Sequence, residues 1–277
     1  MVLRWTEDYE KHLGEAPWRS AFLEDVTAME GREFAFSSLH SPPDGNESGA
    51  SRCGDPRVRF TVFRSFWAEL PDDGSNPAPR NKSTFSSDMP TFTTDGRTAK
   101  VAEILAGGGR PSHDHHEQVS GGGGSGEAVW WARDSNRQWR IRGRVFVLGH
   151  DIAGDTEEAS SVRRALLSRM RIVKEDDKHP WSWETEMTAA FGQLPPAQRG
   201  RFLAPPPGQA TDIPWDHDKY KLWAEVHDLH DPLARENFRV VVIVPEEVEM
   251  LDMKGGRLHY YKFDNGAQTW SHEECWP

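Results

Sequence analysis

The stretch "TFTTDGRTAKVAEIL", residues Thr91 to Leu105, reads as a short strand, a turn and an apolar helix in immediate succession. Thr94 or Asp95 is positioned to cap the helix, and Arg97 and Lys100 flank its first turn. Cations at a helix N-terminus are unfavourable because of the helix dipole, so two of them there point to a compensating anion. The ordinary alternative is a capped turn with solvated charges.

Neutral donors accompany these cations. Thr93, Thr94 and Thr98 place hydroxyl groups within the same few residues. Fixed cations together with hydroxyls and a helix N-terminus are what phosphate recognition requires. The segment alone therefore predicts a phosphate cradle, and an ordinary turn remains open at this point.

Two further stretches carry polar side chains on predicted strands. In "RVRFTVFR" Arg59 and Arg64 are five residues apart, so on one regular strand they would face opposite sides. A bulge, or the end of the strand near Arg64, is needed for both to reach one ligand. In "RQWRIRGRVFV" Gln138 is an amide, which suits the edge of a planar heterocycle, and a solvent-facing Gln138 is the alternative.

The combination of these motifs, in this order, resembles the FMN-binding split β-barrel family of the pyridoxamine 5′-phosphate oxidase type. It is closest to the branch with "PW" before the first helix, here "APWRS", and with "TD-x-R-[ST]-x-K" as its phosphate loop. The C-terminal "VEMLDMKGGRLHYYKF" resembles the same branch, so the similarity runs from Pro17 to Pro277. It implies one FMN-binding split-barrel domain over residues 1–277, with insertions near 41–55, 107–126 and 209–236.

The resemblance also implies roles. It implies FMN as the cofactor, held at the interface of a homodimer, and a small-molecule substrate. The positions that match FMN-contacting residues of the family are Arg59, Arg64, Thr93, Thr94, Arg97, Thr98, Lys100 and Gln138.

The C-terminal segment departs from the true oxidase in part. Arg257 and His259 match the pair that meets the pyridoxine substrate, although a hairpin with surface side chains gives the same pattern. Leu251 and Tyr261 stand where the oxidase has a Trp and an Arg against the flavin. The resemblance thus implies an FMN-dependent oxidoreductase of undetermined substrate, with a non-catalytic flavin-binding or storage protein as the alternative. No catalytic residue is assigned.

Composition limits the other function classes. The 277 residues carry a net charge of −11 and only two cysteines, and no run of 18 apolar residues occurs. These features disfavour nucleic-acid binding, a membrane span and a disulfide framework, and we expect a cytoplasmic protein. The "HDHHE" segment offers His113, His115 and His116 as metal ligands, but its Gly/Ser surroundings favour a solvated loop, so no metal is expected.

Periodicity completes the expected architecture, which is mainly β with peripheral helices (α+β), as an antiparallel barrel. Helices are predicted at 16–30, 156–173 and 181–194, and strands at 33–40, 57–70 and 89–95. Residues 127–149 are predicted as two strands joined by the turn "RDSN", and 257–277 as a hairpin around Asn265 and Gly266. Residues 237–253 are predicted as a strand pair, with "EEVE" as a charged strand edge. The Gly/Ser/His tract at 107–126 is predicted to be a flexible insertion.

Overall fold

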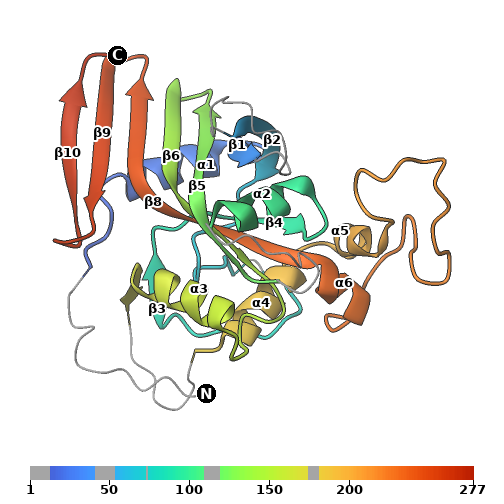
Figure 1. Ribbon diagram of the computed structural model, residues 1–277. Coiled ribbons are helices and arrows are strands. Elements are labelled where there is room, and N and C mark those ends of the chain that lie inside the picture. The colour runs from blue at the N-terminus through green and yellow to red at the C-terminus, as the bar shows by residue number, and fades with distance from the viewer. Residues whose placement is uncertain (1–12, 41–53, 73, 109–118, 174–180) are drawn as a thin grey trace, which may run out of the picture.

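A large antiparallel sheet organises the molecule (Figure 1). The computed structural model describes residues 13–40, 54–72, 74–108, 119–173 and 181–277. The sheet has the strand order β10-β9-β8-β6-β5-β1-β2, and β4 adds to it by pairing with β8. The strands are β1 (Glu33–His40), β2 (Asp55–Val62), β4 (Thr91–Asp95), β5 (Gly121–Ala132), β6 (Arg137–Leu148), β8 (Phe238–Asp252), β9 (Arg257–Asp264) and β10 (Thr269–Cys275).

Helices cover both faces of this sheet. They are α1 (Arg19–Ala28), α2 (Ala99–Gly107), α3 (Glu157–Leu167), α4 (Trp183–Gly192), α5 (Pro196–Gly200), the 3₁₀ turn η2 (Arg201–Leu203) and α6 (Pro232–Asn237). The short strands β3 (Phe85–Ser87) and β7 (Met170–Ile172) form a separate pair. The mainly β architecture with peripheral helices is thus confirmed, with the helices predicted at 16–30 and 181–194 and the hairpins predicted at 127–149 and 257–277.

Strand β8 separates two apolar cores. Successive residues of β8 point to opposite faces of the sheet. Val240 and Val242 pack with α3 and α4, whereas Val241 and Ile243 pack with α1, α2 and the barrel interior. Because both faces of this half of the strand are buried, its sequence is continuously apolar rather than alternating. Many tryptophans lie in these cores, and Trp18, Trp130 and Trp139 are fully buried.

The prediction of two strands between 237 and 253 is wrong. β8 is one strand of 15 residues that continues through Pro245, because Pro245 lies at a bulge where it faces Gly143 of β6. The "EEVE" run is also not a sheet edge, since β6 and β9 pair with it on either side. Its acids instead form cross-strand ion pairs, as in Glu249–Arg140 at 2.9 Å.

The prediction that residues 107–126 form a flexible insertion is wrong in part. The run "GGGGSG" is the first half of β5 and pairs with β6, with a bulge between Gly122 and Gly124. Glycine is needed here because α2 comes very close: a Cβ at Gly124 would lie 2.7 Å from the main chain of Gly107. The His113–His116 segment lies outside the described residues.

Replacing Gly124 by alanine is therefore expected to lower the free energy of unfolding by about 1–3 kcal/mol, because α2 has to move away from β5. Urea denaturation measures this change. Gly14→Ala is the matched control, since a Cβ there has no atom within 4 Å. Equal unfolding midpoints for the two variants would contradict the close packing of α2.

Two other elements end at different residues in the structure than the sequence predicts. β2 ends at Val62 rather than near residue 70, and the helix predicted at 156–173 stops at Leu167 and is followed by β7. The insertion at 209–236 projects as a loop beside α5 and ends in α6 (Figure 1). Among the described residues, no helix is long and apolar enough to cross a membrane.

Candidate functional site

The segment from β4 to α2 forms a tight turn whose main-chain contacts differ from the sequence prediction. Thr98 is the N-cap residue of α2, so the expected capping by Thr94 or Asp95 is wrong. Asp95 instead shapes the turn: its main-chain oxygen accepts hydrogen bonds from the N–H and the hydroxyl of Thr98, at 3.2 and 2.8 Å. The Thr98 hydroxyl accepts no hydrogen bond from the first N–H groups of the helix.

Lys100 converges on the threonines at this helix start. Its Nζ donates to Thr94 Oγ1 at 3.1 Å and to Thr98 Oγ1 at 3.3 Å. Burial, and then the nearby charge of Arg59, lower the pKa of Lys100. Within the described residues no carboxylate pairs with this ammonium, so the cluster carries unbalanced positive charge.

Arg59 reaches the same cluster from β2. Its guanidinium donates to Ser38 Oγ and to Glu103 Oε2, both at 2.6 Å. Glu103 lies on α2 one turn after Lys100 and is buried, so it fixes Arg59 against the helix. The sequence analysis missed Ser38 and Glu103, although a single acid in the apolar run "VAEILA" was a signal for the second.

Arg97 does not join this cluster. Its guanidinium holds both carboxylate oxygens of Asp95, at 2.9 and 2.6 Å, and donates to the main-chain oxygen of Ala204 at 3.0 Å. It also lies 5.7 Å from the ring of Tyr220, in the insertion beside α5. In this arrangement Arg97 ties the turn to the neighbouring segment and leaves Lys100 as the cation at the helix start.

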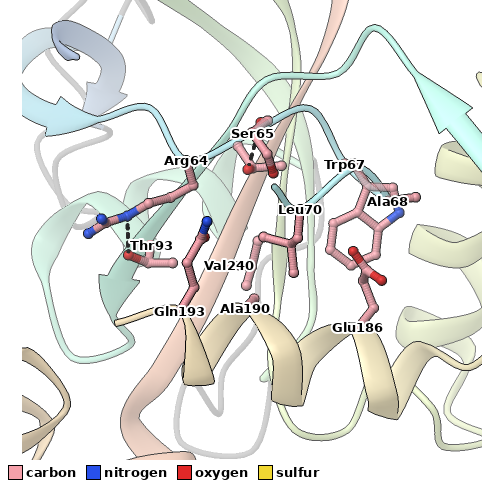
Figure 2. Close-up of a pocket in the computed structure, with 11 residues that line it drawn as sticks. Arg64, Ser65, Trp67, Ala68, Leu70, Thr93, Glu186, Ala190, Gln193 and Val240 are labelled. Carbon is pink, nitrogen blue, oxygen red and sulfur yellow. Dashed lines mark hydrogen bonds between the residues drawn. The ribbon is translucent and has the colours of Figure 1, made fainter. Parts of the chain in front are cut away.

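Arg64 and Thr93 lie on the opposite face of β4 from Thr94. Arg64 follows the end of β2 at Val62, as the five-residue spacing requires, and its Nε donates to Thr93 Oγ1 at 3.3 Å (Figure 2). Burial lowers the pKa of Arg64. Among the strands described, β4 pairs with β8 alone, and its other edge is bonded at Thr91 by the main chain of Arg64 and Ser65.

A small cavity adjoins Arg64, between β4 and α4. It leaves about 10 Å³ for the centre of a water molecule, room for about one water. Glu186 of α4 and Gln193, which follows that helix, lie at its two ends (Figure 2). Glu186 is 4% exposed, and burial raises its pKa to about 7, opposed by its hydrogen bond from Asn81. No sequence signal marks this carboxyl, because "WETEMTAAF" has the pattern of an ordinary helix.

Gln138 lies elsewhere in the chain. It stands opposite Leu251 on β8, whereas β4, the strand that precedes α2, pairs with β8 at residues 238–242. Its other neighbour in register is Trp131, which is 45% exposed, so Gln138 is on the outer face of the sheet. One copy of the chain therefore does not bring Gln138 to Lys100.

The predicted substrate residues lie in the C-terminal hairpin and are engaged within it. Arg257 Nε donates to Glu274 Oε1 at 2.7 Å, and His259 Nδ1 lies 3.1 Å from His272 Nε2. Tyr261 is buried and stacks on His272 with ring centroids 4.5 Å apart. No group of three or more His, Cys, Asp or Glu side chains suited to a metal occurs among the residues the structure describes.

The residues at the start of α2 fit a phosphate group. They supply an unpaired ammonium, a guanidinium, two hydroxyls and the uncapped N–H groups of a nine-residue helix. A carboxylate is present, but Glu103 is already bound to Arg59 and Ser38. The arrangement of the described residues is therefore compatible with binding of an anion.

Comparison with known proteins identifies the fold. Residues 15–149 match the family model described as pyridoxamine 5′-phosphate oxidase, FMN-binding domain. A pyridoxamine 5′-phosphate oxidase-related, FMN-binding protein from Nostoc punctiforme superposes with a TM-score of 0.59 at 19% identity, over 95% of this chain and 100% of that one. No curated protein matches the chain.

A second solved structure is PhzG from Burkholderia lata in complex with tetrahydrophenazine-1-carboxylic acid. It aligns over 100% of this chain and 99% of its own at 13% identity, with a TM-score of 0.42. A similarity at that level supports no conclusion about this chain. The chain nevertheless has the split-barrel fold of FMN-binding pyridoxamine 5′-phosphate oxidase proteins, and its residues 15–149 match the model of that family's FMN-binding domain.

Proposed function

We propose that the chain binds FMN with the phosphate at the N-terminus of α2, and that it is an FMN-dependent oxidoreductase acting on a small molecule. The observation that carries the proposal is the Lys100 ammonium, which has no carboxylate partner among the described residues and is held by Thr94 and Thr98 at the start of a helix. FMN, when bound, supplies the electron transfer, and the protein supplies binding and orientation.

Each group of side chains has a distinct part in this proposal. Lys100 and Arg59 bind the phosphate, and the hydroxyls of Thr94 and Thr98 orient it. Arg64 and Thr93, on the other face of β4, contact the remainder of the cofactor. Because burial weakens its hydration, the Arg64 guanidinium gains more from a new acceptor than an exposed arginine would.

A homodimer is part of the proposal, and its support is the outer face of the sheet. Gln138, Trp131 and Val129 share this face, and the register through Ala35 extends it to Phe60 of β2. Phe60 is 79% exposed and its neighbour Val58 is 68% exposed. The same face also carries the ion pairs of Arg140 with Glu127 and Glu249. Exposed apolar side chains beside charged ones are typical of a protein interface, and a second copy would bring a second Gln138 to a cofactor held between the two chains.

Phe60→Arg is expected to shift the protein from dimer to monomer in analytical ultracentrifugation, because it buries a charge in the interface. FMN retention is expected to fall with it. Trp223→Arg is the matched control, since Trp223 is 96% exposed but lies in the insertion beside α5. A dimer that survives Phe60→Arg would contradict this choice of interface.

A non-catalytic flavin-binding protein is the second candidate. The observation that favours it is the hairpin, where Arg257 and His259 contact Glu274 and His272 rather than standing free for a substrate. Turnover decides between the two. We would assay the FMN-loaded protein for oxidation of pyridoxamine 5′-phosphate and other amines and alcohols, and for reduction by nicotinamide cofactors. Bound FMN without any turnover would favour the second candidate.

A further inference from the structure

Arg239 is a buried cation beside the phosphate loop that no sequence motif marks. It lies on β8 directly opposite Thr94 of β4, so both side chains are on the face of the sheet that α2 covers. The residue is 8% exposed. Its guanidinium reaches beneath the turn, and a Cβ at Gly96 would come within 2.8 Å of its Cζ.

Glycine at two positions makes room for this guanidinium. Besides Gly96, which belongs to the "TDGR" turn, Gly149 at the end of β6 would place a Cβ 3.2 Å from Arg239 Nε. The side chain is fixed on one side by hydrogen bonds from Nη1 to the main-chain oxygens of Glu236 and Phe238, at 2.6 and 2.9 Å. Its Nε has no hydrogen-bond partner.

The positive charge of Arg239 is not neutralised by a nearby acid. The carboxylate of Asp95 is held by Arg97, and that of Asp151 by the hydroxyl and N–H of Ser120. No carboxylate of the described residues lies within ion-pair distance of Arg239. Burial lowers the pKa of this guanidinium, only partly opposed by the charges of Asp151, Asp95 and Glu236. A buried, unpaired charge of this kind is costly unless an anion approaches it.

We propose that Arg239 is a positioning residue of the phosphate site: it supports the Gly96 turn from below and supplies a buried positive charge that the FMN phosphate neutralises. The proposal rests on the function proposed above. Arg239 acts through the turn rather than by a direct contact, so its effect should be specific for the phosphate and absent for the rest of the flavin.

Comparison of FMN with riboflavin, which lacks the phosphate, isolates this effect. In fluorescence-quenching titrations, Arg239→Gln is expected to weaken FMN binding about tenfold or more and to change riboflavin binding little. The Gln amide can still donate to the Glu236 oxygen, which keeps the segment folded. Arg239→Lys, which retains the charge, is expected to keep most of the preference for FMN.

Arg169→Gln is the matched control. Arg169 is also a buried arginine with a lowered pKa, but it donates to the oxygen of Pro245, far along β8 from the turn. The role of Arg239 would be overturned if Arg239→Gln weakened the binding of both flavins equally or of neither. It would also be overturned if Arg169→Gln lost the preference for FMN to the same extent. A wild-type protein that binds FMN and riboflavin equally would instead remove the phosphate site itself.

Discussion

Lys100→Met is expected to weaken FMN binding roughly 100-fold, since a charge-assisted hydrogen bond to phosphate contributes about 1.5–3 kcal/mol. Lys100 is the cation that Thr94 and Thr98 hold at the start of α2, and no carboxylate of the described chain competes for it. Methionine has a similar length without the charge, so the fold of the turn is retained. Equilibrium titration followed by flavin fluorescence measures the change.

Arg97→Met is the matched control for that experiment. Both residues lie in the "TDGRTAK" turn, but Arg97 is bound to Asp95 and to the oxygen of Ala204. It is expected to weaken FMN binding less than tenfold and mainly to loosen the segment around Tyr220. An Arg97→Met variant that loses as much affinity as Lys100→Met would show that the guanidinium leaves Asp95 for the ligand.

Glu186→Gln is expected to stabilise the protein above neutral pH by about 3 kcal/mol, because the folded protein holds the Glu186 carboxyl at a pKa of about 7 against 4.5 for a solvated glutamate. A carboxyl with a raised pKa binds a proton more tightly when folded. The free energy of unfolding therefore falls as pH rises from about 4.5 to about 7, by up to about 1.4 kcal/mol per pH unit.

Urea denaturation between pH 5 and pH 8 tests this expectation. The wild type should lose stability across the range relative to Glu186→Gln, and the two should be alike near pH 5. Glu184→Gln, on the exposed face of the same helix, should follow the wild type. Parallel pH profiles for wild type and Glu186→Gln would contradict the burial of an unpaired carboxyl beside the Arg64 cavity.

The sequence predicted those parts of the fold in which local pattern and tertiary environment agree. The hairpin of β5 and β6 alternates and is joined by a turn in which Asn136 has φ 55°, so pattern and backbone give the same result. The glycine run of β5 could not be predicted, because its reason is the approach of Gly107 from another element. The single long β8 was hidden by Pro245, whose tolerance depends on a bulge with Gly143.

The candidate site was predictable as a set of residue types but not as an arrangement. Thr94, Thr98 and Lys100 meet because they lie within one turn, which sequence spacing describes well. Arg97 lies in the same turn and yet faces away, since Asp95 and the distant Ala204 oxygen provide its partners. Gln138 stands on the outer face of the sheet, a location that depends on strand register rather than on its motif.

If the start of α2 binds the phosphate of FMN, as we propose, the protein must distinguish FMN from riboflavin, which has no phosphate. Purified protein is loaded with FMN or with riboflavin, desalted, and examined for retained flavin absorbance. Retention of about one FMN per chain, with little riboflavin retained and with FMN lost in Lys100→Met, is the predicted result. Equal retention of the two flavins, or FMN retention that is unchanged in Lys100→Met, would contradict the claim.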